Sequence, residues 1–311
     1  SNQHSGKMTE AIYLEISEKA ESAHKAQRRV SVSGMLKYLG VSRSGYHAWK
    51  KRVPSNTAKR REAVKANIKD IYDESKQNYG APKITKQLRE AGEIISERTV
   101  GKYMKQMGLK AQWVKPWTIT TRDSDFSNKL QNILDEHFNP ERPNAVWCSD
   151  ITYIWTIDGF VYLTSIMDLY SRKIIAWTLS KSMEVSCVIE TINKAKARRN
   201  IEKPLILHSD RGSQYVSKEY KRVTAGIQCS YSKKAYPWDN ACIESFHSLI
   251  KREWLNRFKI RDHKHAYQLV FEYVEAFYNT KRIHSHCDYM SPNDYEERYH
   301  KLQQNESILI S

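Results

Sequence analysis

The second half of the chain alternates β-forming and helix-forming stretches in an order that few folds share. Residues 145–156 are rich in β-forming side chains, and the pair Asp158-Gly159 that follows is typical of a hairpin turn. In chain order the expected elements are strands at residues 145–156, 160–167 and 173–179, a helix at 184–198, a strand at 205–208, a helix at 218–225, a strand at 228–232 and a helix at 240–255.

This order, βββαβαβα, predicts one mixed sheet. The first three strands are close enough in the chain to pair antiparallel, and the later strands need helical crossovers and therefore pair parallel. The order is that of a ribonuclease-H-like α/β core, in which the first and fourth strands are neighbours. We therefore expect a ribonuclease-H-like core preceded by small all-α domains.

Three carboxylates fall at informative places in this predicted sheet. Asp150 lies within an apolar strand, where a charged group is costly unless a cation compensates it. Asp210 directly follows the fourth strand, and parallel sheets place ligands at the carboxyl ends of their strands. Glu244 lies in the first turn of the last helix. If the first and fourth strands are neighbours, both aspartates project from one edge and the helix brings Glu244 across.

Three converging carboxylates repel one another, and divalent cations relieve that repulsion. Hard oxygen ligands suit Mg²⁺ or Mn²⁺, and two ions roughly 4 Å apart activate a water or a 3′-hydroxyl and stabilise the leaving oxygen. The pattern therefore predicts Asp150, Asp210 and Glu244 as catalytic, metal-binding residues. The alternative for any one of them taken singly is a turn or surface acid.

The helix at residues 240–255 carries further candidates. Asn240, Ser248 and Lys251 share one helix face with Glu244. Lys251 lies about 10 Å beyond Glu244 along the helix axis, so it could hold a DNA phosphate next to the scissile one. The alternative is an ordinary surface lysine.

The positive charge of the chain is concentrated in one segment. The 311 residues carry a net charge of +16, and residues 25–116 alone hold 22 basic and 7 acidic residues, a net charge of +15. Such a concentration favours a polyanion, because each neutralised phosphate releases condensed counterions. Nucleic acid is therefore the expected partner, against the alternative of a solvated helical surface.

The basic segment has the proportions of two helix-turn-helix units. In the first, a helix at residues 9–29 and a short helix ending at Gly40 precede a helix capped by Ser42; in the second, helices at 63–75 and 82–90 precede a helix at 97–107 capped by Ser96. Either unit alone could be an ordinary three-helix module, but two in tandem favour DNA binding. The candidate base contacts are Arg43, Ser44, His47, Arg98 and Lys102.

The length suits more than one domain. We expect a helix with the first helix-turn-helix unit at residues 1–55, the second unit at 56–112, a proline-interrupted linker at 113–143 with an optional helix at 125–137, and the catalytic domain at 144–300. The five cysteines form no CxxC pair, which indicates reduced thiols in a cytosolic protein and argues against structural zinc. No apolar run is long enough to span a membrane and the N-terminus is polar, so neither a membrane nor a secreted protein is expected.

Three segments together resemble a DDE transposase: residues 147–153 (WCSDITY), 208–215 (HSDRGSQY) and 239–246 (DNACIESF). More narrowly, the chain resembles the integrase-like transposases, products of the second reading frame, of bacterial insertion-sequence family three. Residues 40–46, 79–109, 168–173, 278–285 and 291–296 are also similar to that family. The chain departs from the family pattern in having 33 residues between Asp210 and Glu244, about two fewer than usual, and Cys287-Asp288 where Leu-Gly is common.

The resemblance implies that Asp150, Asp210 and Glu244 bind two Mg²⁺ or Mn²⁺ ions and that Lys251 contacts the transposon end. It implies 3′-end cleavage by water and then strand transfer by the freed 3′-hydroxyl, through a circular intermediate. The implied partners are double-stranded DNA, both terminal inverted repeats and target, and at least a second copy of the chain, in the bacterial cytoplasm at the nucleoid. Whether a partner protein from the upstream reading frame is also required stays an open question. The alternatives are a DNA-binding repressor with an inactive core and a metal-dependent nuclease.

Overall fold

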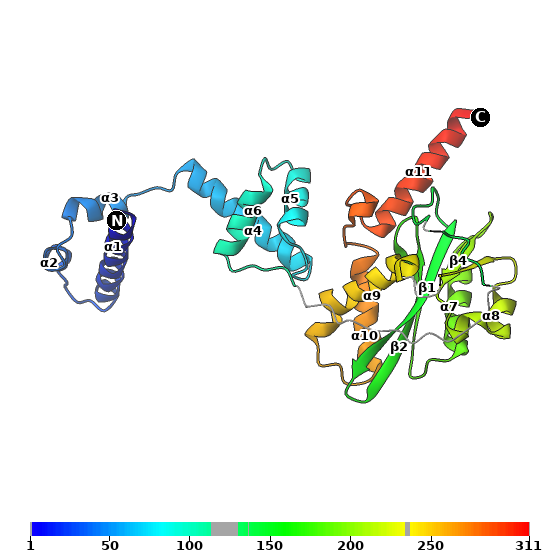
Figure 1. The fold of residues 1–311 in the computed structure, drawn as a ribbon. Coiled ribbons are helices and arrows are strands. Elements are labelled where there is room, and N and C mark those ends of the chain that lie inside the picture. Colours follow the sequence, from blue (N-terminus) through cyan, green and yellow to red (C-terminus); the bar gives the residue numbers. More distant parts are fainter. Residues whose placement is uncertain (1, 113–129, 136, 234–236, 311) are drawn as a thin grey trace. The chain divides into compact units, whose positions relative to one another are not determined.

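The computed structural model describes residues 2–112, 130–135, 137–233 and 237–310 (Figure 1). The chain forms two compact units, Ser1–Ala66 and Asn67–Ser311, and the division between them falls inside a helix, α4 (Asn56–Glu74). Each unit is described by itself.

The first unit holds the first predicted helix-turn-helix. Its helices are α1 (Asn2–Lys25), α2 (Val32–Tyr38) and α3 (Arg43–Lys50). The predicted cap is confirmed, since the Ser42 hydroxyl accepts a hydrogen bond of 3.1 Å from the Gly45 amide. Tyr13, Ile16, Leu36 and Tyr46 form the core. The first helix is displaced from the expected residues 9–29, beginning at Asn2 and ending at Lys25.

The second helix-turn-helix is built from the same parts. It contains the end of α4, α5 (Ala81–Glu90) and α6 (Glu97–Gln106). The Ser96 hydroxyl caps α6 by accepting from the Thr99 amide at 3.2 Å, as predicted. The first of these helices begins at Asn56 instead of residue 63, because Ser55 supplies an earlier cap by accepting from the Ala58 amide at 3.2 Å.

The expected strand order is confirmed in the larger unit. The strands are β1 (Val146–Thr156), β2 (Gly159–Asp168), β3 (Lys173–Ser180), β4 (Ile206–Ser209) and β5 (Gln228–Tyr231), and they lie in the order β3-β2-β1-β4-β5. The β1–β2 and β2–β3 pairs are antiparallel, whereas β1–β4 and β4–β5 are parallel. The fold is therefore a ribonuclease-H-like mixed sheet.

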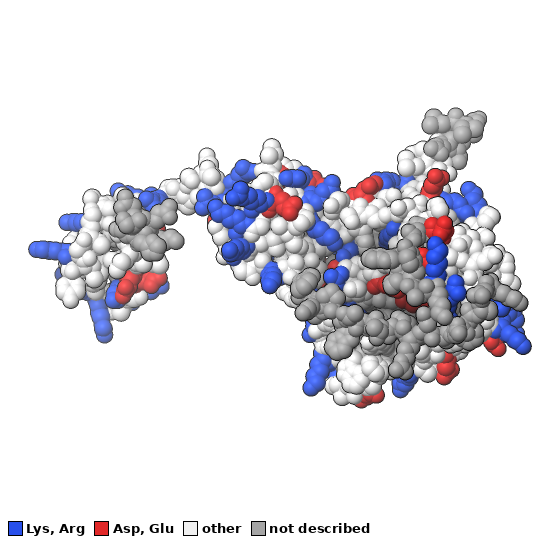
Figure 2. Space-filling view, viewed as in Figure 1, with Lys and Arg blue, Asp and Glu red and all other residues white. Residues whose placement is uncertain are grey.

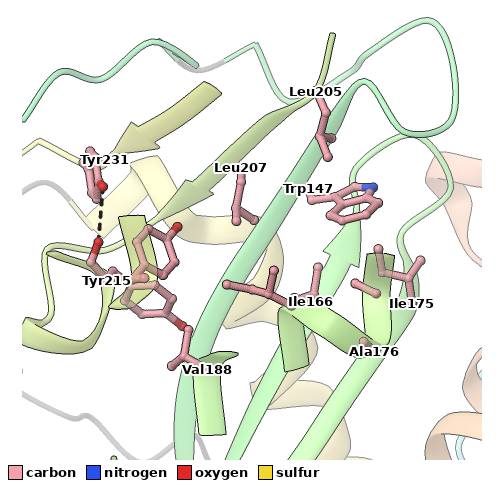
Figure 3. Close-up of a cluster of buried hydrophobic side chains, with 12 residues drawn as sticks. Trp147, Ile166, Ile175, Ala176, Val188, Leu205, Leu207, Tyr215 and Tyr231 are labelled. Carbon is pink, nitrogen blue, oxygen red and sulfur yellow. Dashed lines mark hydrogen bonds between the residues drawn. The ribbon is translucent and has the colours of Figure 1, made fainter. Parts of the chain in front are cut away.

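Helices cover both faces of this sheet (Figure 1). On one face α7 (Val185–Arg198) and α8 (Lys218–Val223) enclose a core with Trp147, Ile166 and Leu207, and the Tyr231 hydroxyl donates to the Tyr215 carbonyl beside it (Figure 3). On the other face lie α9 (Ala241–Glu253) and α10 (His263–Tyr273). Alternate residues of β1 consequently point to different helices.

The remaining elements are short turns and a C-terminal helix. They are the 3₁₀ turns Ser213–Val216, Pro237–Asn240, Leu255–Arg257 and Ser285–Cys287, the π-helical turn Val274–Tyr278 and the helix α11 (Pro292–Ile310). Asp288 adopts φ +51°, a left-handed conformation that favours glycine. Its carboxylate accepts a hydrogen bond of 2.6 Å from Arg298 Nη2, so the turn forms without glycine.

The possible helix predicted at residues 125–137 is not formed by those of its residues that the structure describes. Residues 125–129 and 136 lie outside the described part, and residues 130–135 are not helical. Their backbone bonds to β5 instead: the Tyr231 amide donates to the Gln131 carbonyl, and the Ile133 and Leu134 amides donate to the Ser230 hydroxyl. Among the described helices, none is both long and apolar enough to cross a bilayer.

A buried ion cluster ties α11 to the sheet. Arg199 donates to Asp168 at 2.7 Å and to both oxygens of Glu296 at 2.8 Å. Burial, reinforced by the nearby Glu296 charge, raises the pKa of Asp168 to about 6, and Arg199 opposes this rise. The cluster joins the end of β2, the end of α7 and the first turns of α11.

We predict that Arg199→Met destabilises the protein by about 3–5 kcal/mol, because two buried carboxylates lose their cation. Urea unfolding followed by circular dichroism measures the loss. Arg198→Met is the matched control: the Arg198 side chain is 54% exposed, and its pairing with Glu275 contributes about 1 kcal/mol or less. Equal stability of the two variants would show that the cluster does not hold α11 in place.

Candidate active site

The candidate site begins where β1 and β4 part. These strands pair in parallel from Val146 with Ile206 to Ser149 with Ser209, and the next residue on each strand is an aspartate, Asp150 or Asp210. The expected adjacency of the first and fourth strands is thereby confirmed. Two carboxylates from distant parts of the sequence emerge at one edge of the sheet because the pairing stops there.

Asp150 points to the α9 face of the sheet. Its Oδ2 lies 3.3 Å from Nδ1 of His247, a buried residue of α9. The other ring nitrogen, Nε2, is 3.2 Å from the Ser165 hydroxyl, and Ser165 is the residue directly opposite Asp150 on β2. His247 therefore contacts both members of one cross-strand pair. Sequence reasoning missed this residue, although its place three residues after Glu244 puts it one turn away on the same helix.

The loop after β4 fixes Asp210. The Gly212 amide donates to Asp210 Oδ1 at 2.9 Å. A Cβ at Gly212 would lie 3.0 Å from that same oxygen, so a side chain there would crowd the carboxylate. The neighbouring Arg211 donates to the carbonyls of Ser232 and Leu130 and so is committed to the adjoining strand region.

Glu244 completes the group from the first turn of α9. Limited hydration raises its pKa to about 7, with further contributions from the charges of Asp150 and Asp210. The pKa of the buried Tyr215 hydroxyl is raised by burial and by the same two aspartates. The charges of Asp150 on β1 and of Asp210 just after β4 thus both reach Glu244 on the helix.

Lys251 also lies beside β1, the strand that carries Asp150. Its ammonium donates to the Thr152 hydroxyl at 2.7 Å and stands 4.6 Å from the centre of the Tyr153 ring. Burial lowers the Lys251 pKa, and the Asp150 charge opposes that effect. The lysine is therefore directed toward the strand that carries Asp150.

The other predicted DNA contacts differ in exposure. Asn240 is buried at the start of α9 and Ser248 is half-buried, whereas the five helix-turn-helix candidates are exposed: Arg43, Ser44 and His47 on α3, and Arg98 and Lys102 on α6. Asn240 consequently presents no surface in this conformation.

The donor set suits a hard divalent cation. In the part of the chain that the structure describes, no three His, Cys, Asp or Glu side chains are close enough to form a complete metal-binding group. Asp150, Asp210 and Glu244 nevertheless offer only carboxylate oxygens, the donors Mg²⁺ and Mn²⁺ prefer. Partial burial is the main cause of the raised pKa of Glu244, and the charges of Asp150 and Asp210 add to it; a bound cation would offset these two charges.

The turn at residues 284–287 has a structural role. His284 contacts Arg282, the His286 ring contacts the Tyr170 carbonyl, and the Cys287 thiol donates to the Ser171 carbonyl. Each of these side chains thus has a partner within the protein.

Three family models match the chain. Two models, each described as an integrase core domain, match residues 140–237 and 225–292, and a model described as an HTH-like domain matches residues 59–117. The matches cover the mixed sheet with its carboxylates and the second helix-turn-helix.

Individual relatives extend over most of the chain. The transposase for insertion sequence element IS904 from Lactococcus lactis subsp. lactis (strain IL1403) is 38% identical over 79% of this chain and 98% of its own. Transposase InsF for insertion sequence IS3A from Escherichia coli (strain K12) is 32% identical over 88% and 96%. Among solved structures, the HTLV-2 integrase catalytic core domain in complex with magnesium aligns over 50% of this chain and 98% of its own, with 16% identity and a TM-score of 0.40.

We predict that, in metal-free protein, the Glu244 carboxyl titrates near pH 7 and that Asp150→Asn lowers its pKa without restoring the ordinary value, because one repelling charge is removed while burial, the larger cause, remains. Carbon-13 NMR of Glu-labelled protein measures the shift. Asp158→Asn, which changes a carboxylate at the far end of β1, is the control and leaves the titration unchanged.

The sign of the accompanying stability change follows from the same pKa. The unfolded chain loses this proton near pH 4.5 and the folded chain near 7, so this group lowers the stability as the pH rises between those values. If the Glu244 pKa is the same in Asp150→Asn as in wild type, the charge of Asp150 does not act on Glu244.

Proposed function

Because the chain belongs to the DDE-type transposases of bacterial insertion sequences, we propose that it cleaves the 3′ ends of its element and joins the freed 3′-hydroxyl to target DNA. Membership rests on relatives that are 32–38% identical over most of both chains. We assign Asp150, Asp210 and Glu244 as the two aspartates and the glutamate of that enzyme class. The observation that carries this assignment is the parallel pairing of β1 and β4, which delivers Asp150 and Asp210 side by side, together with the effect of both charges on the Glu244 pKa.

The three carboxylates would hold two Mg²⁺ or Mn²⁺ ions. Bound there, such ions favour deprotonation of the attacking water or hydroxyl and neutralise charge that develops on the phosphate. Asp150 and Asp210 contribute ligands fixed by the sheet and by the Gly212 amide, and His247 orients the Asp150 carboxylate. Glu244, with a pKa of about 7, becomes fully available as a carboxylate only when its proton is lost.

In this proposal the cleavage and joining steps are both displacements at phosphorus. Water attacks the phosphodiester at the element end, and the 3′ oxygen leaves and gains a proton. The new 3′-hydroxyl then attacks a target phosphodiester, forming one bond as another breaks. A circular form of the element would lie between these stages.

DNA recognition is assigned to the basic helical units, with the domain division at residues 1–55, 56–112, 113–143 and 144–300. The charge of +15 over residues 25–116 supports phosphate binding, and the exposed side chains of α3 and α6 are the candidates for base contacts. We assign Lys251 and Ser248 to the DNA next to the cut; Asn240, which is buried, would reach DNA only if the start of α9 moved. The two ends of the element must be brought together, so we expect at least a homodimer, with or without an upstream-frame partner protein. We expect it to act where bacterial DNA lies, in the cytoplasm at the nucleoid.

Asp150→Asn should abolish both nicking and joining of labelled element-end DNA in Mg²⁺, because the variant loses a charged ligand while keeping its shape. DNA binding by gel shift should stay within about twofold, since phosphate and base contacts lie elsewhere. Glu202→Gln, which changes an exposed carboxylate in the loop before β4, is the matched control and should cut normally. Undiminished cleavage by Asp150→Asn would remove the metal assignment, and wild-type protein that binds but never nicks would indicate a repressor.

Lys251→Ala should weaken end-specific cleavage by about tenfold with the circular dichroism spectrum unchanged, because one cation beside the cut is lost. The salt dependence of binding should fall by a slope of about 1. Lys301→Ala, on a lysine of α11 whose side chain is 68% exposed, is the control. Normal use of element ends by Lys251→Ala would return this lysine to a purely structural contact with Thr152.

His247→Phe should reduce Mn²⁺ affinity, measured by calorimetry, by about 10- to 100-fold, because a residue that orients a ligand has been removed. His247→Gln, which keeps a side-chain nitrogen donor, should recover part of the affinity. Equal Mn²⁺ binding by wild type and His247→Phe would show that Asp150 needs no such support.

A further inference from the structure

The strands β1 and β2 continue past the candidate site as a two-stranded arm, which we define as residues 153–161. β4 pairs with β1 only as far as Ser149, and β3 pairs with β2 only from Tyr162 onward. Within the arm, each strand pairs only with the other, and the Thr156 hydroxyl donates to the Gly159 carbonyl to close the turn. The arm therefore projects from the edge of the sheet at which Asp150 emerges.

The arm carries large apolar side chains that face solvent. Trp155 is 63% exposed, Ile157 57% and Phe160 48%. Trp155 and Phe160 are opposite residues of the hairpin whose rings meet edge to face at 4.8 Å, and Phe160 also meets the half-buried Tyr153 at 5.1 Å. Exposed aromatic side chains gathered in this way are unusual on a protein surface and mark sites of interaction.

A basic segment is bonded to the tip of this arm. The Ile157 amide donates to the Ile260 carbonyl at 2.9 Å, and the Asp158 amide donates to the Arg261 carbonyl at 3.2 Å. Within residues 257–265, which we call the basic strap, Lys259, Arg261 and Lys264 are exposed. Figure 2 shows Lys and Arg side chains (blue) on both sides of the lower end of the larger unit, with an acidic patch (red) between them.

We propose that the arm and the basic strap bind unpaired DNA bases next to the cut, with the aromatic rings stacking on bases and the strap contacting phosphates. The proposal rests on the proposed function for its substrate. Trp155 lies five residues beyond Asp150 on β1, roughly 17 Å at ~3.4 Å per residue. That distance corresponds to about five steps of duplex DNA from the phosphate that is cut, at ~3.4 Å per step, and to fewer nucleotides of an extended unpaired strand.

Two physical arguments favour unpaired DNA as the occupant. Base faces are hidden within an intact duplex, and aromatic side chains bind those faces when a strand is unpaired. A second copy of this chain is a poorer partner for the strap, because each copy carries a net charge of +16 and the strap is itself basic.

The test compares two fluorescent DNA probes with the full chain in EDTA, where no cutting occurs. One probe is a blunt 20-base-pair duplex, and the other is the same duplex with a single-stranded tail of ten thymidines. The double variant Trp155→Ala/Phe160→Ala should bind the tailed probe roughly 5- to 100-fold more weakly than wild type, by fluorescence anisotropy. Its affinity for the blunt probe, held by the helix-turn-helix units, should not change.

Matched variants separate this result from a general loss of structure. Phe271→Ala removes a 49%-exposed aromatic ring from α10 and should bind both probes as wild type does. Trp155→Phe keeps a stacking surface and should retain most of the tailed-probe affinity. Lys259→Gln/Arg261→Gln should weaken the tailed probe and reduce its salt dependence.

The position of the contact provides an independent readout. With 5-iodouracil placed at each tail position in turn, photocross-linking to the peptide that holds residues 153–161 should occur and should disappear in the double variant. Equal affinity of the double variant and wild type for the tailed probe would overturn the proposal. So would a change from dimer to monomer by light scattering without loss of DNA affinity, which would make the arm a self-association surface. Because no step requires cutting, failure of wild type to nick element ends would refute the proposed function separately.

Discussion

Four residue pairs between β1 and β4 carry the geometry of the candidate site, since each strand delivers an aspartate at the first position beyond them. Side chains alternate between the faces of a sheet, so a slip of one residue would turn Asp150 away from α9. Trp147 and Leu207 form one of these pairs, and both are fully buried in the core. The packing that stabilises the fold therefore also sets the register of the carboxylates.

The third carboxylate is held by a different kind of interaction. Glu244 lies on α9, which packs on the sheet through Ile243, Phe246 and Ile250. At the far end of the helix, Arg282 donates to both oxygens of the buried Glu253, and Tyr273 donates to one of them. Glu244 is thus positioned by side-chain packing and one buried ion pair, without the backbone pairing that fixes the two aspartates.

Much of the fold was predictable from the sequence because its signals are local. Alternating β-formers, the hairpin pair Asp158-Gly159 and the caps Ser42 and Ser96 each act within a few residues. The order of strands and helices along the chain also predicted the order of strands in the sheet. The adjacency of Asp150 and Asp210 follows from that order.

The predictions were wrong or incomplete where contacts between segments distant in the chain decide the local structure. Residues 130–135 have helical composition, but bonds to Ser230 and Tyr231 hold them in an irregular segment that ends in a turn. The contact of His247 with both Asp150 and Ser165 depends on the β1–β2 register, and the Lys251 bond to Thr152 depends on how α9 lies across the sheet. None of these could be inferred from spacing along the chain alone.

The path between Asp210 and Glu244 bears on how such a site can change over evolution. The chain leaves the sheet after β4, forms α8 and β5, and returns to begin α9. β5 pairs with the outer side of β4, so the segment between Asp210 and Glu244 leaves the sheet and returns to it. Its first end is held by β4 and its last end by α9. Loops tolerate insertions and deletions better than paired strands do, so the 33 residues between Asp210 and Glu244 can change in number at the bends of this segment while its endpoints stay in place. The alignment of the two inner strands has no such freedom.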